Sequence, residues 1–346
     1  MTYHRYTPRT KSASGKVPLI FGLVLVFLTW CLNAHGAAVT DRAKNEGKLV
    51  VYSSMSSADT DVLVRRFQAK YPSIKPTFLR LNSGRLMTKI LQEAQAGTYL
   101  ADVYQTGSIE VYMFQKKGLV AKYSSPEAKN YEESFRDPEG HYISFYFTPK
   151  VIAYNTKMVP RETVPKSYAD LLRPYWSGKL GMPGGNAGVR WLIGMMKRMG
   201  DDNGEDFMKK LAGQQVRLHP GITEATSLLA AGEHHGLVYT NADNVEELKR
   251  KGAPLEWVAD EPVTTTQTVL ALSSRAPDPN AAKLYIDFVL SKEGQEIIRS
   301  FNRIPARSDV SSDPPRLKKG LKFFPYYGTW AEDENKYTEK FHAIFR

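Results

Sequence analysis

The sequence predicts an α/β fold with mainly parallel sheets. Short apolar, β-branched runs such as 47–54 alternate with segments whose apolar residues recur at helical spacing. A hydrophobic content of 42% and a charged content of 24% are typical of a globular protein with a solvated surface. A chain of 346 residues suits one large domain or two of ordinary size, so it has ample surface to bury.

The first 37 residues predict a secretory signal peptide. Residues 1–16 carry four basic side chains and no acid, 17–32 form an apolar run, and small residues follow at 34 and 36–38. An uncleaved membrane anchor is the alternative, although the apolar run is shorter than the roughly 20 residues of a membrane span. Cys31, the single cysteine, lies inside this segment. Lipid attachment there is disfavoured because the bulky Trp30 precedes it.

Charge and cysteine content restrict the partners and the compartment. Without the signal segment the chain has 43 basic and 36 acidic residues, a formal charge near +7 that is dispersed along the sequence. No basic run is interleaved with aromatic residues, so we expect no nucleic-acid partner. A moderate positive charge suits an anionic ligand or an acidic partner surface. An exported chain without thiols fits the bacterial periplasm and excludes a cysteine-based metal site.

The first α/β unit places small polar residues after successive strands. Strands are predicted at 47–54, 74–81 and 102–104, and each precedes a helix. In parallel sheets ligands collect at the carboxyl ends of the strands. These positions could bind a ligand, or the serines could simply cap helices. They are Ser53, Ser54, Ser83, Gly84 and Thr106.

A glycine-rich turn predicts an anion site in the second unit. The strand at 179–182 leads through a turn into a helix that we expect to begin near Ala187, with Asn186 as its N-cap. Free N–H groups at Ala187 and Gly188, the helix dipole and Arg190 in the first turn would together attract an anion. The alternatives are an ordinary strand-to-helix connection and an Arg190 that points into solvent.

The second unit extends over about 155–260 and ends its strands in a similar way. Its strands are predicted at 216–218, 236–240 and 255–258, and polar groups near their ends are Thr223, Tyr239 and Asn241. An extended segment at 263–271 follows, then helices at 281–290 and 291–301. An aromatic-rich tail ends in a helix at 333–344.

One stretch carries a family resemblance. Residues 279–298 read PNAAKLYIDFVLSKEGQEII and are followed by RIPAR at 303–307. With GKLVVYSS, VIAYNTKMV and WSGKLGMP, in this order, the chain resembles the periplasmic solute-binding proteins of ABC importers, in the ferric-iron-binding branch. The resemblance covers roughly residues 46–308.

The resemblance implies a type II fold of two α/β lobes joined by two crossing strands, near 148–153 and 262–268. Lobe 1 would comprise 38–150 and 266–346, and lobe 2 would comprise 151–265. A ligand would bind in the cleft, hinge closure would trap it, and the closed monomer would dock on an inner-membrane permease.

The chain departs from the family at the metal site. Iron-binding members hold Fe³⁺ with two adjacent tyrosines, and Asn241 and Ala242 occupy the matching positions here. We therefore expect no metal and no cofactor, and we expect a small phosphate, phosphonate or carboxylate compound at the helix start. Ferric binding through Tyr239 and another tyrosine such as Tyr146 is the alternative. His234 and His235 are expected at the surface.

The expected function is binding rather than catalysis. The sequence contains no Ser-His-Asp arrangement, no paired-carboxylate motif and no HExxH motif. An exported hydrolase or transferase on the same scaffold is the alternative from another class. A sensor that presents its liganded form to a chemoreceptor would use the same cleft as a transport protein.

Overall fold

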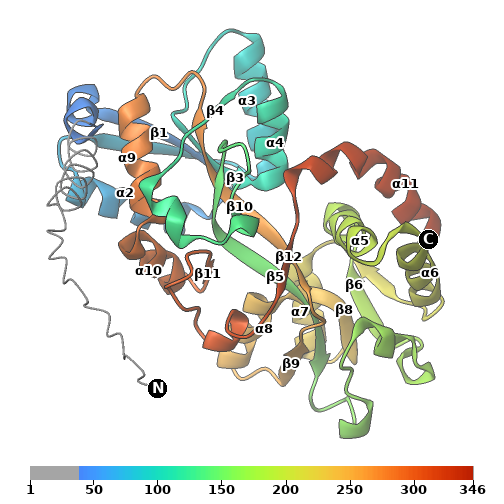
Figure 1. Ribbon diagram of the computed structural model, residues 1–346. Coiled ribbons are helices and arrows are strands. Elements are labelled where there is room, and N and C mark those ends of the chain that lie inside the picture. Colours follow the sequence, from blue (N-terminus) through green and yellow to red (C-terminus); the bar gives the residue numbers. More distant parts are fainter. Residues whose placement is uncertain (1–38, 346) are drawn as a thin grey trace, which may run out of the picture.

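The computed structural model describes residues 39–345, which form two α/β lobes (Figure 1). The predicted signal peptide lies outside these residues. In lobe 1 the sheet order is β2-β1-β3-β10-β5, in which β1 is parallel to β2 and β3, and β10 is antiparallel to β3 and β5. The strands are β1 (Lys48–Ser53), β2 (Lys75–Arg80), β3 (Val103–Gly107), β5 (Ile143–Asn155) and β10 (Val263–Ser273).

The sheet of lobe 2 contains the second half of β5, from Lys150 onward. There β8 pairs antiparallel with β5 and parallel with β6, and β6 pairs parallel with β7. The predicted α/β fold is therefore confirmed, and its sheets are mixed: among the described strands, every antiparallel pairing involves β5 or β10. The strands are β6 (Leu180–Pro183), β7 (Arg217–His219), β8 (Gly236–Asn241) and β9 (Leu255–Val258).

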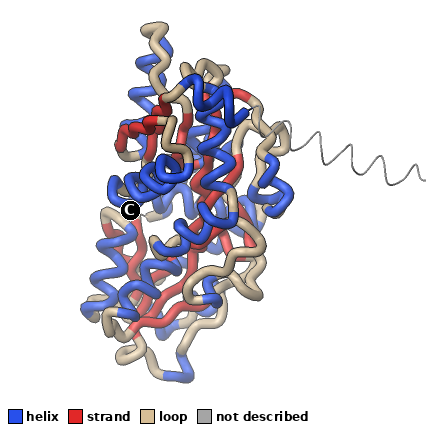
Figure 2. Tube along the Cα trace, turned by 90° about the vertical axis from the view of Figure 1, so that its left-hand side faces the viewer, coloured by secondary structure: helices blue, strands red, loops and turns tan. Residues whose placement is uncertain are grey.

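Strand β5 connects the two sheets. Its residues up to Pro149 pair with β10, and its residues from Lys150 onward pair with β8 and β9. The second connection leaves β9 and enters β10 at Val263. Figure 2 shows the two lobes one above the other with strands running from one to the other. The predicted crossing strands near 148–153 and 262–268 are confirmed.

Helices cover both sides of each sheet. In lobe 1 an aromatic cluster joins α2 to α9, since Phe67 packs edge-on against Tyr285 and Phe288 at 5.3 and 5.8 Å between ring centroids. In lobe 2 the rings of Trp191 and Tyr239 stack at 4.9 Å. The helices are α2 (Ser57–Lys70), α3 (Ser83–Gln95), α4 (Ser108–Lys116), α5 (Gly185–Met199), α6 (Asp201–Ala212), α7 (Ile222–Ala231), α8 (Ala242–Arg250), α9 (Pro279–Leu290) and α10 (Lys292–Ser300).

The C-terminal segment does not stay in lobe 1. We call residues Phe323–Ile344 the C-terminal arm; it comprises β12 (Phe323–Pro325), a 3₁₀ turn η7 (Gly328–Asp333) and α11 (Glu334–Ile344). Its first strand pairs with β10, η7 packs on α4, and α11 packs on α5 and α6 of lobe 2. The assignment of the whole range 266–346 to lobe 1 is therefore wrong at its end, because buried aromatic side chains hold α11 on lobe 2. The other boundaries stay predictions.

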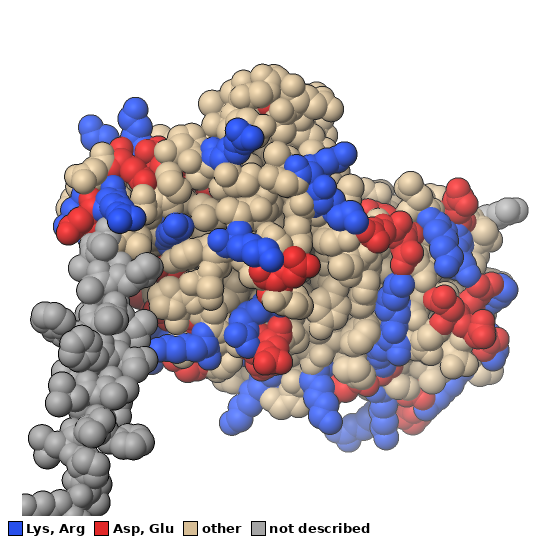
Figure 3. Space-filling model, turned by 45° about the horizontal axis from the view of Figure 1, so that its top comes forward, with Lys and Arg blue, Asp and Glu red and all other residues tan. Residues whose placement is uncertain are grey.

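The described surface matches the dispersed charge of the sequence. On the face shown in Figure 3, basic and acidic side chains are intermixed over both lobes. Within residues 39–345, no helix is long and apolar enough to cross a membrane.

Candidate functional site

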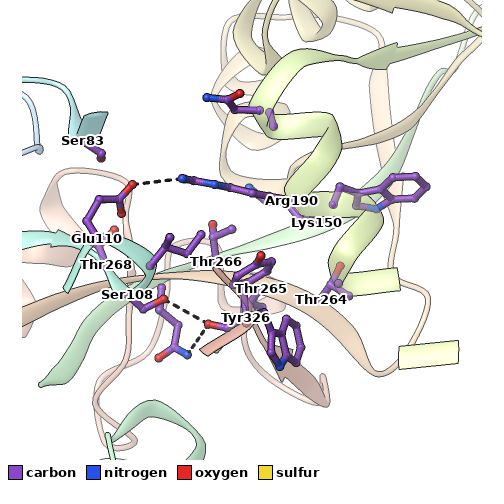
Figure 4. Close-up of a pocket in the computed structure, with 18 of the residues that line it drawn as sticks. Ser83, Ser108, Glu110, Lys150, Arg190, Thr264, Thr265, Thr266, Thr268 and Tyr326 are labelled. Carbon is purple, nitrogen blue, oxygen red and sulfur yellow. Dashed lines mark hydrogen bonds and ion pairs between the residues drawn. The ribbon is translucent and has the colours of Figure 1, made fainter. Parts of the chain in front are cut away.

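A cavity of about 380 Å³ lies between the lobes. Most of its lining comes from the first turn of α4, the first half of α5, strand β10 and the C-terminal arm, and β5 adds Lys150 (Figure 4). Its volume lies within the range of small-molecule sites and exceeds what a bare inorganic ion needs.

Glu110 places a carboxylate inside this cavity from lobe 1. Glu110 is the third residue of α4 and is 3% exposed. A Cβ atom at the N-cap Gly107 would lie 2.3 Å from its Oε2 atom, so the carboxylate folds back over the first turn and lies against the backbone of Gly107. The positive end of the helix dipole favours this placement. The chain's own carboxylate therefore fills the anion position at the start of α4.

Arg190 faces Glu110 from lobe 2 (Figure 4). Its Nη2 atom lies 3.3 Å from Oε1 of Glu110, and its Nε atom lies 3.2 Å from Oε1 of Glu334 in the arm. Arg190 thus lines the cavity as predicted, but two carboxylates already balance its charge. The alternative of an outward, solvated Arg190 is excluded.

Lys150 is a cavity residue that the sequence analysis missed. It lies on β5 at the crossing point, and its Nζ atom donates a 2.7 Å hydrogen bond to Oδ1 of Asn241, a neutral partner. Burial lowers the pKa of Lys150 to about 8, against the opposing effect of nearby Asp243. The only sequence signal was a lone lysine inside the apolar run FYFTPKVIAY.

Several polar atoms of the lining lack partners. Within residues 39–345 these buried atoms make no hydrogen bond: Oγ1 of Thr264, Oγ1 of Thr265, Oε1 of Gln267 and the hydroxyl of Tyr326. The amide orientation of Gln267 is defined, because its Nε2 atom donates to the carbonyl of Tyr326 at 3.3 Å. Its unpaired oxygen accepts only, so it needs a donor. A buried polar atom left without a partner costs about 1–3 kcal/mol.

Aromatic side chains of the arm form one wall. Phe324, Tyr326 and Trp330 line the cavity, and the ring of Trp330 packs against that of Tyr326 at 4.9 Å. No local sequence pattern places the tail at the site, because nothing within residues 324–330 shows that they reach a strand some 60 positions earlier.

The start of α5 differs from the prediction. The helix begins at Gly185 with Gly184 as N-cap, two residues before the expected start, so Asn186 is inside the first turn. The N–H group of Gly188 is not free, because it donates to the carbonyl of Gly184 at 3.1 Å. A Cβ at Gly188 would lie 2.6 Å from Cζ of Phe341, so Gly188 is a packing position beneath the arm.

Five of the twelve predicted site residues line the cavity, namely Ser54, Ser83, Asn186, Ala187 and Arg190. Their contact with a ligand stays a prediction. Seven lie outside the lining: Ser53, Gly84, Thr106, Gly188, Thr223, Tyr239 and Asn241.

The surroundings of the residues outside the cavity lining show what these residues do instead. Ser53 Oγ is buried and bonded to Thr60, Gln105 and the N–H of Met55. Thr106 is fully buried in β3, and Thr223 is exposed on α7. Gly84 lies in the first turn of α3, where its neighbour Asn82 caps the helix. Asn241 accepts a hydrogen bond from Lys150, which does line the cavity.

Tyr239 cannot serve as the predicted alternative iron ligand in this arrangement. It is fully buried, stacks on Trp191 and donates its hydroxyl to the carbonyl of Pro183 at 3.1 Å. Among residues 39–345, no group of three His, Cys, Asp or Glu side chains could hold a metal ion.

The expectation that His234 lies at the surface is wrong. It is 3% exposed, and its Nε2 atom lies 2.7 Å from Nε2 of His219. Burial lowers the pKa of His234 to about 4, so it is uncharged at neutral pH.

Two α/β lobes, two crossing strands and a polar cavity between the lobes define a two-lobed solute-binding protein. A family model described as "Bacterial extracellular solute-binding protein" matches residues 110–328, which is more than half of the chain. The chain belongs to this family.

Three known proteins show the range of its relatives. An uncharacterised protein of Haemophilus influenzae is 29% identical over 338 residues, covering 89% of this chain and 94% of the relative. Iron-bound HitA from Pseudomonas aeruginosa superposes with a TM-score of 0.72 at 22% identity, covering 86% of this chain and 99% of HitA. The periplasmic binding protein AfuA from Actinobacillus pleuropneumoniae, with fructose-6-phosphate bound, gives 0.68 at 25% identity, covering 86% and 98%. The predicted type II fold and the resemblance to the iron-binding branch are confirmed.

Proposed function

We propose that this protein is the periplasmic substrate-binding component of an ABC-type importer. It captures a small organic anion in the cavity between its lobes and delivers it to an inner-membrane permease, without catalysing a reaction. It acts as a monomer. The predicted export signal and the family membership support this role.

The environment of Lys150 is the observation that supports an anionic ligand. A buried ammonium group that donates its hydrogen bond to a neutral amide is only partly compensated by the nearby carboxylate of Asp243. An anion in the cavity would supply the missing charge, and a charge-assisted hydrogen bond contributes about 1.5–3 kcal/mol. Arg190 is a weaker candidate, since Glu110 and Glu334 already pair with it. We therefore place the anionic group beside Lys150, in the cavity that Asn186 and Ala187 at the start of α5 also line.

The unpaired polar atoms of the cavity lining indicate which functional groups the rest of the ligand has. Phosphate and carboxylate oxygens accept hydrogen bonds, so they cannot satisfy the acceptor Oε1 of Gln267. A ligand hydroxyl both donates and accepts, and therefore suits Gln267 together with Thr264 and Thr265. We propose a phosphate, phosphonate or carboxylate compound with a hydroxyl-bearing carbon skeleton. The fructose-6-phosphate bound to AfuA has this chemistry.

The first experiment is mass spectrometry of the ligand released from freshly purified protein. Thermal-shift assays then compare fructose-6-phosphate, fructose, ethylphosphonate and inorganic phosphate as probes. Occupancy at 100 times the dissociation constant adds about 2.7 kcal/mol of stability, which is readily measured. We expect the phosphorylated sugar to stabilise the protein more than either fructose or the simple anions.

Two lysine variants test the proposed contact. Lys150→Met should abolish the shift, whereas Lys157→Met, at an exposed position just after β5, should keep it. A Lys150→Met protein that binds the probe normally would overturn the proposed anion position. A visible charge-transfer band on ferric titration would favour the iron alternative instead.

A further inference from the structure

The C-terminal arm is the third connection between the lobes, besides β5 and β10. Its strand β12 pairs with β10, and the N–H of Tyr326 donates to the carbonyl of Thr265 at 2.7 Å. Beyond this point the arm leaves the sheet and passes over α4 of lobe 1 before it reaches α5 and α6 of lobe 2 (Figure 1).

Three consecutive acidic residues of the arm make contacts to different lobes. Glu332 accepts a 2.5 Å hydrogen bond from the hydroxyl of Tyr112 and lies 3.0 Å from Nζ of Lys116, both on α4. The next two residues turn to α5, where Asp333 pairs with Lys197 at 2.7 Å and Glu334 pairs with Arg190 at 3.2 Å. The junction between Glu332 and Asp333 is therefore where the arm passes from one lobe to the other.

The two attachments differ in strength. On lobe 2 the side chains of Tyr337 and Phe341 are each 1% exposed, and burial of one large apolar side chain contributes about 1.5–3 kcal/mol. On lobe 1 the charged contacts of Glu332 are half exposed, and exposed ion pairs contribute about 0–1 kcal/mol. Gly328 adds a close backbone contact there, since a Cβ at this position would lie 2.6 Å from the carbonyl oxygen of Ser108.

We propose that the part of the arm beyond Tyr326 is a releasable clasp that stays fixed to lobe 2 and holds α4 of lobe 1 when the cleft is closed. Glu332 and Gly328 are its positioning residues. Release from α4 withdraws Trp330 from the cavity wall and opens the site from the side, while Tyr326 stays paired with Thr265 of β10. This goes beyond solute binding itself, since it concerns how the lobes are held together.

The test measures the distance between the lobes without any ligand. Residues 39–345 contain no cysteine, so spin labels can be attached at Gln95→Cys on α3 and Ser227→Cys on α7, both exposed. Two variants weaken the contact with α4 by different means. Glu332→Gln removes a charge, and Gly328→Val introduces a side chain that clashes with α4. Glu339→Gln removes the same charge from an exposed position on α11 and is the matched control.

We expect both clasp variants to show a population at an interlobe distance absent from the parent protein, and a larger radius of gyration in small-angle scattering. The control should keep the parent distribution, and circular dichroism should report an intact fold for Glu332→Gln. Unchanged distances in both clasp variants would overturn the proposal. So would an equal change in Glu339→Gln, because the effect would then come from net charge.

Discussion

Lys150 and Asn241 are register partners at the point where β5 passes from one sheet to the other, and a 2.7 Å hydrogen bond joins their side chains. The cation is thus held at the crossing strand rather than on a mobile loop. Asn241 occupies a position at which iron-binding relatives are expected to carry a tyrosine. In this chain it supports a lysine, which is consistent with a ligand that brings its own negative charge.

Replacing Lys150 with Met should stabilise the unliganded protein. The pKa of Lys150 is lowered in the folded state, so below pH 8 its protonated form opposes folding. Removing the charge should raise the free energy of unfolding by about 1–3 kcal/mol at pH 7, after allowing for the lost bond to Asn241. Urea denaturation of Lys150→Met and Lys157→Met measures this. A Lys150→Met protein less stable than the parent would contradict it.

The affinity for an anionic ligand should fall as the pH rises through about 8. Above this pH the unliganded protein loses the proton of Lys150, and binding must then restore it. We expect close to a tenfold loss of affinity per pH unit until the higher pKa of the complex is reached. Isothermal titration calorimetry between pH 7 and 9.5, in buffers of different ionisation enthalpy, would show proton uptake. A flat profile would place the anion elsewhere.

Two glycines that both belong to the predicted site should respond in opposite ways to alanine. At Gly84, on α3, the nearest atom to a new Cβ is 3.9 Å away, so Gly84→Ala should stabilise the helix by about 0.5–1 kcal/mol. At Gly188 the new Cβ would lie 2.6 Å from Phe341 and 2.9 Å from the carbonyl oxygen of Pro183. Gly188→Ala should therefore destabilise the protein by about 1–3 kcal/mol.

This result would show that Gly188 is a packing position beneath the arm. Thermal denaturation of the two variants side by side is the measurement. Equal melting temperatures for both would show that the arm yields at this contact.

Tyr239→Phe should affect stability without changing ligand binding. The substitution removes one buried hydrogen bond, to the carbonyl of Pro183, and keeps the stack on Trp191. We expect a loss of about 0.5–1.5 kcal/mol. Affinity for the probe found by thermal shift should stay within twofold of the parent value. A selective loss of affinity, or of a ferric absorption band, would return Tyr239 to the site.

Local patterns predicted the elements well, and the site only in part. The strand at 74–81, the helix after it and the final helix at 333–344 match the structure to within a residue or two, because hydrophobic periodicity reports which face of an element is buried. The start of α5 was placed two residues late, because Asn186 is a good capping residue and the prediction followed that preference.

The unpredicted part depends on contacts between distant segments. Gly188 meets Phe341 across 153 positions, and Glu110 meets Arg190 across 80. No local pattern contains such pairs, so charge balance and packing at the cavity could not be inferred. The apolar neighbours of Lys150 concealed it in the same way, since a buried strand and a cavity wall have the same sequence pattern.

The shared strand β5 also limits how this chain can vary in length. Successive residues of a strand point to opposite faces, so a one-residue insertion near Pro149 would reverse every side chain that follows it. Lys150 would then leave the cavity, and Val151 and Ala153 would exchange faces with Ile152 in a sheet buried on both sides. Insertions and deletions should therefore be tolerated in the exposed turn at 156–157 but not within 143–155.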